Sequence, residues 1–128
     1  MYDVFISYVT PNLEKADDVN DRLKAEGFNT FFDRKNMYGG GDFGESLIKG
    51  VKQSRALVFL HSRYANEHDD NIIGEIQAAK DKPIPIIVIK LDGAPYNDKL
   101  AYRLNTEHFI KFNGTSFESC LDELVETL

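Results

Sequence analysis

Residues 56–91 read ALVFLHSRYANEHDDNIIGEIQAAKDKPIPIIVIKL and contain two hydrophobic runs separated by an amphipathic stretch. The runs at 56–60 and 84–91 have the length and residue types of buried strands. Between them, apolar residues recur at helical spacing after Asp69 and Asp70, which are residue types that favour a helix beginning. The segment therefore predicts a strand, then a helix that starts at one of these two aspartates, then a second strand.

Glu75 lies one turn inside this predicted helix. At 3.6 residues per turn, Ile72, Ile76 and Ala79 share one apolar face, which we expect to be buried. Glu75 falls at the border of that face, and Gly74 beside it leaves room. Most helical glutamates are solvated, so this position alone does not establish a function.

Strand-like and helical segments alternate along the whole chain. We expect strands at 2–8, 28–32, 56–61, 84–91 and 108–112, and helical segments at 13–26, after Asp42, after Asp69 or Asp70, around 100–104 and after Ser116. This alternation implies right-handed crossovers and a parallel sheet. We predict an α/β, flavodoxin-like fold with five parallel strands in the order 2-1-3-4-5, flanked by helices. The length suits one domain spanning residues 1–128, compatible with excision from a longer multidomain protein.

Composition and charge argue against several classes of partner. The chain is 42% hydrophobic and 28% charged, as in soluble globular proteins. A net charge of −6 without a basic run argues against nucleic acid or an anionic membrane surface as the partner. No apolar stretch is long enough to span a bilayer, and the N-terminus has no signal-peptide pattern. With the single Cys120, these features predict a cytoplasmic protein.

The predicted strand order places a candidate ligand site between the first and third strands. In such sheets, ligands bind outside the carboxyl ends of the strands where the order reverses. Tyr8, Val9 and Thr10 follow the first strand, and Ser62 follows the third. The helix that carries Glu75 begins soon after Ser62, which favours a functional role for Glu75.

Four motifs suggest other chemistry, and each has a simpler explanation. Residues 39–44 (GGGDFG) match GxGxxG, but they lie well past the second strand and lack the later acidic ribose ligand of a Rossmann site. Residues 67–70 (EHDD) resemble a metal cluster, yet adjacent residues at a helix start cannot converge on one ion, so we predict no metal. His61 and Ser62 lack a third residue that would orient a nucleophile. A phosphoacceptor receiver domain needs acidic residues at the ends of the first and third strands. In this chain those two strand ends carry none.

The chain resembles a Toll/interleukin-1 receptor (TIR) domain over nearly its whole length. Residues 3–8 (DVFISY) resemble the family's opening box, and residues 32–43 (FDRKNMYGGGDF) resemble its second strand and BB loop. Ser62-Arg63-Tyr64, then Asp70, then Glu75-Ile76 with Ala79 resemble its third-helix pattern. The compact glycine-rich loop is more similar to bacterial members than to animal adaptor domains.

The resemblance implies an NAD+ glycohydrolase or cyclase. Many members of the family cleave NAD+ at the nicotinamide–ribose bond, and their essential glutamate corresponds to Glu75. NAD+ is then the substrate, no cofactor or metal is required, and the product is ADP-ribose or a cyclic ADP-ribose variant. The implied NAD+ pocket comprises Tyr8, Val9, Phe32, Asp33, Arg34, Phe43, Ser62 and Asn71. Asn71 stands where the family often has a tryptophan.

The resemblance also implies self-assembly. Family members stack through the loop at 34–43 and neighbouring helices, often in open head-to-tail arrays, and a role in bacterial anti-phage defence follows by the same resemblance. The alternative is a non-enzymatic module that only recruits other TIR domains. The enzymatic hypothesis predicts that Glu75→Ala abolishes nicotinamide release without unfolding the domain.

Overall fold

Five parallel strands form one sheet in the order β2-β1-β3-β4-β5. The computed structural model describes residues 1–32, 43–112 and 116–128. The order confirms the predicted flavodoxin-like fold. In chain order the elements are β1 (Val4–Ser7), η1 (Thr10–Asn12), α1 (Leu13–Ala25), β2 (Thr30–Phe31), α2 (Phe43–Lys52), β3 (Leu57–His61), α3 (Arg63–Glu67), α4 (Asp70–Asp81), β4 (Ile86–Lys90), α5 (Asp98–Leu104), β5 (His108–Lys111) and α6 (Phe117–Thr127).

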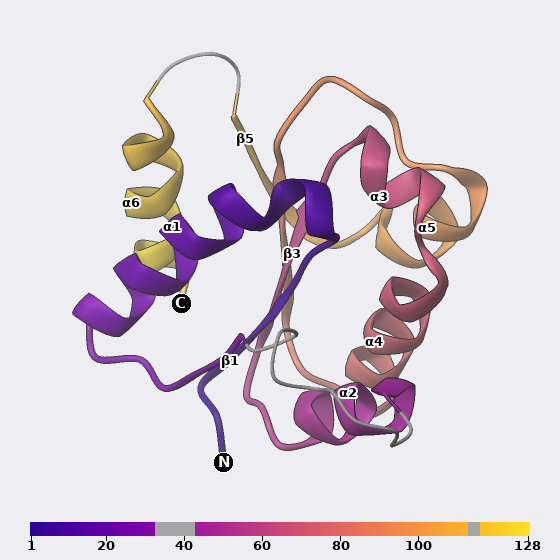
Figure 1. The fold of residues 1–128 in the computed structure, drawn as a ribbon, viewed down its shortest axis with the longest axis horizontal. Helices are drawn as coiled ribbons and strands as arrows, with labels where there is room; N and C mark the ends of the chain where they lie inside the picture. Colours follow the sequence, from indigo (N-terminus) through magenta and orange to yellow (C-terminus); the bar gives the residue numbers. More distant parts are fainter. Residues whose placement is uncertain (33–42, 113–115) are drawn as a thin grey trace.

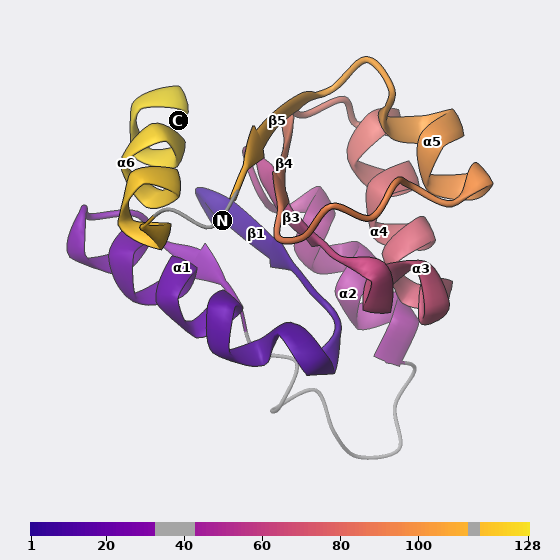
Figure 2. The ribbon, with the colours of Figure 1, turned by 90° about the horizontal axis from the view of Figure 1, so that it is seen from above.

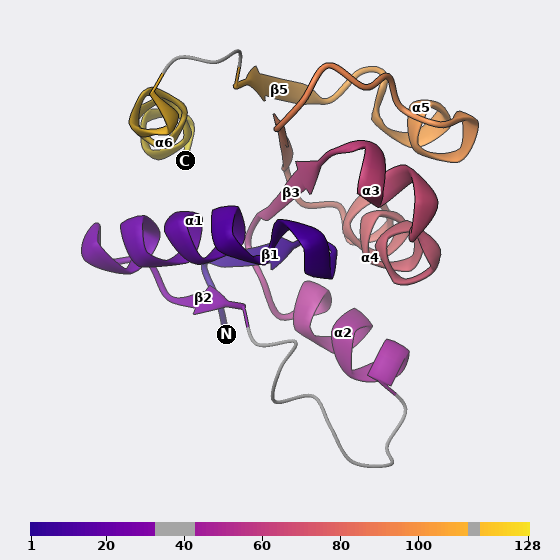
Figure 3. The same cartoon turned by 45° about the horizontal axis from the view of Figure 1, so that its top comes forward.

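Helices cover both faces of the sheet. In Figure 1, α1 and α6 lie on one side of the central strands, and α2, α3, α4 and α5 lie on the other. Figures 2 and 3 show the same two layers from other directions. Two separate hydrophobic clusters fill the spaces between the sheet and these layers. Among the described residues, no helix has both the length and the apolar character needed to cross a membrane.

Strand β1 distributes its side chains between these two clusters. Val4 and Ile6 belong to the cluster under α1 and α6, whereas Phe5 belongs to the cluster under the other four helices. Because successive strand residues point to opposite faces, Ser7 faces the same layer as Phe5. All four residues of β1 are buried, as predicted for a strand covered on both sides.

The helix predicted from the central segment begins at Asp70, which confirms its position. Its predicted inward residues Ile72, Ile76 and Ala79 are fully buried. The expected side-chain cap is wrong, however, because the Asp69 side chain makes no capping bond. Its Oδ2 instead accepts a hydrogen bond of 2.8 Å from Asn97 Nδ2, which ties the start of α4 to α5.

The second strand is shorter than the predicted 28–32 and comprises only Thr30–Phe31. Phe28 donates its backbone N–H to the Leu23 carbonyl and so helps to close the end of α1. The next N–H group, that of Asn29, donates to a carboxylate oxygen of Asp3 rather than to the sheet. These two residues are therefore used in the turn between α1 and β2.

Candidate functional site

Glu75 is fully buried, deeper than the border position that its helical spacing predicted. Ser7 Oγ donates a hydrogen bond of 2.7 Å to Glu75 Oε1. Ser7 is the last residue of β1 and pairs in register with Phe59 of β3. The carboxylate therefore lies at the carboxyl end of β1 where the strand order reverses, which is where this fold class binds ligands. A buried glutamate is rare unless it is partnered, so this position demands an explanation.

A pocket of about 320 Å³ opens at the beginning of α4, one helical turn before Glu75. Its described lining consists of Val9, Thr10 and Pro11, which follow β1, and His68 and Asn71 from the beginning of α4 and the turn before it. Asn71 and Glu75 are four residues apart on one helix, so they occupy neighbouring turns on the same side. The volume is at the lower end of the range of about 300–1,000 Å³ for small-molecule sites.

Two of the predicted pocket residues have their described contacts on the other face of the sheet. Tyr8 is buried in the cluster under α1 and α6, and its ring stacks on that of Phe32 at a centroid distance of 5.4 Å. Val9, the next residue, belongs to the cluster on the Glu75 face and lines the pocket. Strand alternation explains this division between adjacent residues.

Ser62 has a structural role that its sequence position did not reveal. Its Oγ accepts a hydrogen bond from the Tyr64 backbone N–H at 3.2 Å and so caps α3, a short helix that was not predicted. The same hydroxyl donates to Asn12 Oδ1 at 2.7 Å. Because Asn12 follows β1 and Ser62 follows β3, this bond joins the two strand ends that flank the switch point.

The remaining predicted pocket residues cannot be placed against Glu75. Asp33, Arg34 and most of the predicted assembly loop at 34–43 lie outside the described residues. Phe43 is the first residue of α2, but its side chain also lies outside the described part. Their predicted roles stay predictions.

His61 and Ser62 do not form a nucleophilic pair, since each has its own partner. His61 Nε2 lies 2.9 Å from Asn66 Oδ1, and the amide of Asn66 donates to the Pro95 carbonyl at 2.9 Å. The carbonyl oxygen of the Asn66 amide therefore faces the imidazole, and Nε2 carries the proton. Burial lowers the pKa of His61, so the neutral form is favoured in the folded protein.

His61 is expected to make stability fall as the pH drops below about 6.5. In the unfolded chain the imidazole binds a proton near this ordinary pKa, whereas in the folded protein its lowered pKa delays protonation. The unfolded state therefore binds more protons in this window, and acid favours unfolding. Thermal unfolding of the wild type and His61→Gln between pH 7.5 and pH 5.5 checks this. Equal losses in both proteins would contradict it.

The acidic residues at the start of α4 do not gather around a common point. No group of three His, Cys, Asp or Glu side chains that could hold a metal ion occurs in residues 1–32, 43–112 and 116–128. Asp69 of the predicted EHDD motif points its carboxylate at Asn97 instead. Asp69 thus contributes to the local structure of α4 and α5.

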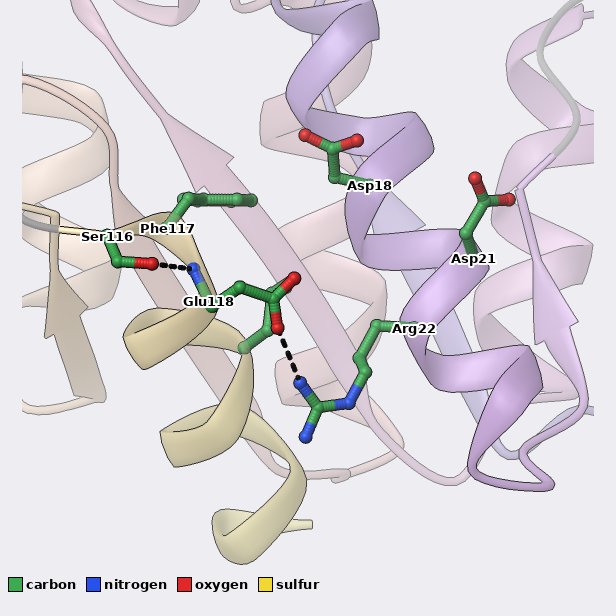
Figure 4. A pocket seen from close by; sticks show the side chains of 7 residues that line it. Asp18, Asp21, Arg22, Ser116, Phe117 and Glu118 are labelled. Atoms are coloured by element: carbon green, nitrogen blue, oxygen red, sulfur yellow. Dashed lines mark hydrogen bonds and ion pairs between the residues drawn. The ribbon is translucent and has the colours of Figure 1, made fainter.

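A second pocket, of about 470 Å³, lies between α1 and α6 and has the wrong charge for a dinucleotide. Figure 4 shows Asp18, Asp21 and Glu118 around it, and Arg22 is the one cation among its described lining residues. The Arg22 guanidinium is already engaged with Glu26, Glu118 and Asp122. A phosphate placed here would face several carboxylates and no available cation from this lining.

The family model for the TIR domain matches residues 4–125. This chain belongs to the TIR-domain family. The match covers almost the whole chain, including β1, α4 and most of α6, and it confirms the resemblance carried by the three boxes. A comparison with curated proteins finds no significant match.

Solved structures of low sequence identity share this fold. The TIR domain of the Toll-related receptor TRR-2 from Hydra magnipapillata is 17% identical, with a TM-score of 0.76 over 99% of this chain and 97% of that one. The TIR domains of the activated Roq1 resistosome, which recognises the pathogen effector XopQ, are 15% identical, with a TM-score of 0.82 over 100% and 99%. The CMP N-glycosidase BcmB from Clostridium botulinum is 16% identical, with a TM-score of 0.72 over 98% of each chain.

The TIR domain has two residues near its candidate site that the sequence did not single out, Ser7 and Asn12, and a third, His68, that was considered only as part of a possible metal cluster. Ser7 contacts Glu75, Asn12 contacts Ser62, and His68 lines the pocket. For Ser7 a signal was present, because it is a polar residue at alternate spacing between the apolar Phe5 and Val9. For His68 the position beside Asp69 indicated only the helix start.

Proposed function

We propose that this TIR domain cleaves the N-glycosidic bond between nicotinamide and ribose in NAD+, with Glu75 as the essential carboxylate. The observation that carries the proposal is a fully buried glutamate, held by Ser7, at the switch point of the sheet and one helical turn from a pocket. An ionisable group in such a place is costly to bury, so its presence at the switch point of the sheet calls for a functional explanation.

The chemistry needs one anionic group beside the sugar. When the bond from ribose C1′ to the pyridinium nitrogen breaks, its electron pair stays on that nitrogen, and nicotinamide leaves as a neutral ring. The ribose becomes an oxocarbenium-like cation, which the Glu75 carboxylate stabilises electrostatically. Water then bonds to C1′ and loses a proton, giving ADP-ribose, or a nucleophile within the same molecule closes a cyclic variant. The leaving group needs no general acid, and NAD+ is a substrate rather than a cofactor.

The fold neighbours support this class of reaction without identifying the substrate. BcmB is described as a CMP N-glycosidase, so a chain of similar fold acts on an N-glycosidic bond of a nucleotide. The Roq1 TIR domains belong to a resistosome, which supports assembly. We propose that copies of this domain assemble through residues 34–43 and that assembly activates cleavage, in the cytoplasm and in a bacterial immune setting such as anti-phage defence.

The second candidate is a non-enzymatic TIR–TIR interaction module, which the assembly of the Roq1 TIR domains also favours. Incubating the full chain with NAD+ at high concentration, with nicotinamide followed by chromatography, separates the two. Under the enzymatic proposal, we expect nicotinamide to appear, with a rate per molecule that rises with protein concentration or on fusion to an oligomerising partner. Silence under both conditions would leave the interaction module as the function.

A further inference from the structure

We propose that Ser7 is a positioning residue for Glu75, holding its carboxylate in the orientation that the reaction needs. This inference rests on the proposed function and deepens it at the same site. Ser7 and Glu75 are separated by 68 positions in the sequence, and both side chains are fully buried. The bond therefore joins the central strand directly to the helix that carries the reactive group.

The surroundings indicate that this hydrogen bond is not needed for packing. The face of β1 that bears Ser7 also bears Phe5. Phe5 and Val9, which lies two residues past the strand, belong to a hydrophobic cluster with Ile72 and Ile76 of α4. A buried polar pair contributes little net stability, and replacing both members with apolar groups of similar shape is often neutral or stabilising. A purely structural contact between β1 and α4 could be apolar, as its neighbours are.

The geometry gives the hydroxyl a specific task. A glutamate carboxyl rotates broadly about its last torsion, so burial of the stem alone does not fix the plane of its oxygens. The distance of 2.7 Å from Ser7 Oγ to Oε1 is that of a well-formed O–H···O hydrogen bond, so the hydroxyl fixes the position of one carboxyl oxygen. Ser7 pairs in register with Phe59 of β3, so the donor is attached to a strand that is hydrogen-bonded into the sheet.

The expected consequence is a loss of turnover rather than of substrate binding. A displacement of about 1 Å in a reacting group can cost about 100-fold in rate. Ser7→Ala is therefore expected to lower kcat by about 10- to 100-fold and to leave KM within about 3-fold, because the pocket lining is untouched. Ser7→Thr, which keeps the hydroxyl, is expected to restore most of kcat.

Ser54 supplies a matched control for any loss of stability. It is another fully buried serine, and its Oγ donates a bond of 2.8 Å to the Gly50 carbonyl. It precedes β3 and bridges to Tyr2, so it lies at the amino-terminal ends of β1 and β3, whereas the pocket residues Val9, Thr10 and Pro11 follow the carboxyl end of β1. Ser54→Ala should lower the melting temperature about as much as Ser7→Ala does, yet leave kcat unchanged.

A double-mutant cycle that combines Ser7→Ala with Glu75→Gln completes the test. It uses the full chain with NAD+ as the substrate, and it measures the rate of cleavage by single-turnover kinetics and the melting temperature of each variant. If Ser7 acts through Glu75, Ser7→Ala has no further effect on the residual rate in the Glu75→Gln protein. If the wild type cleaves NAD+ and Ser7→Ala has the same kcat, Ser7 has no positioning role. The same conclusion follows if Ser7→Ala lowers the rate equally in the wild-type and Glu75→Gln proteins, and in both cases the proposed function stands. Absence of cleavage by the wild type at any concentration would overturn both.

Discussion

Replacing Glu75 with glutamine is expected to reduce nicotinamide release from NAD+ by about 100- to 1,000-fold while the domain stays folded. The loss follows from removing the negative charge that stabilises the ribose cation; single transition-state electrostatic contacts are worth about 100- to 1,000-fold. Glutamine has nearly the same shape, and its carbonyl oxygen can still accept the hydrogen bond from Ser7 Oγ. The measurement is the initial rate of nicotinamide release at saturating NAD+, together with the melting temperature.

Glutamine is a better substitution than alanine because of the burial of Glu75. Alanine would leave a cavity and a buried Ser7 hydroxyl without its acceptor, which costs about 1–3 kcal/mol for the polar group alone. Glu126→Gln is the matched control, since it removes one negative charge from an exposed position on α6, on the other face of the sheet. Release by Glu75→Gln at the rate of Glu126→Gln would rule out Glu75 as the essential carboxylate.

The topology could be predicted from the sequence because buried parallel strands are apolar on both faces. The runs that contain β3 and β4 are continuous rather than alternating, and each is followed by a helical or irregular connection. Those two features leave few arrangements of five strands. The ends of the elements were less predictable, since the residues that close α1 also take the first positions expected for β2.

The depth of Glu75 could not be predicted from its own helix. A helical wheel shows only which side faces the sheet, and Glu75 is at the border of that side. The structure shows that α4 is covered by α2 as well as by the sheet, because Gly74 of α4 lies beside Ile48 of α2. The hydrogen bond between Glu75 and Ser7 joins residues 68 positions apart, a pairing that no local pattern encodes. The stacking of Tyr8 on Phe32, on the opposite face of the sheet, likewise joins residues that follow two different strands, so it could not be predicted from a local pattern.

Two helical glycines are expected to respond to alanine in opposite directions. A Cβ on Gly50 of α2 would lie 2.8 Å from the Phe31 ring, whereas one on Gly74 of α4 would lie 3.9 Å from the nearest atom, Ile48 Cδ1. The first distance is a clash and the second is an ordinary contact. Because alanine favours helix by about 1 kcal/mol over glycine, Gly74→Ala should raise the free energy of unfolding by about 0.5–1 kcal/mol.

Gly50→Ala should instead lower the free energy of unfolding, because the Phe31 ring cannot move aside freely. That ring stacks on Phe5 at a centroid distance of 4.8 Å and meets Tyr2 edge-on at 5.1 Å. Overpacking of a core costs about 1–3 kcal/mol, which exceeds or matches the gain in helix propensity. Urea unfolding of the two variants, compared at equal m-values, measures the difference directly. A Gly50→Ala protein as stable as Gly74→Ala would show that β2 shifts to accept the methyl group, and that this edge of the sheet is softer than its aromatic contacts imply.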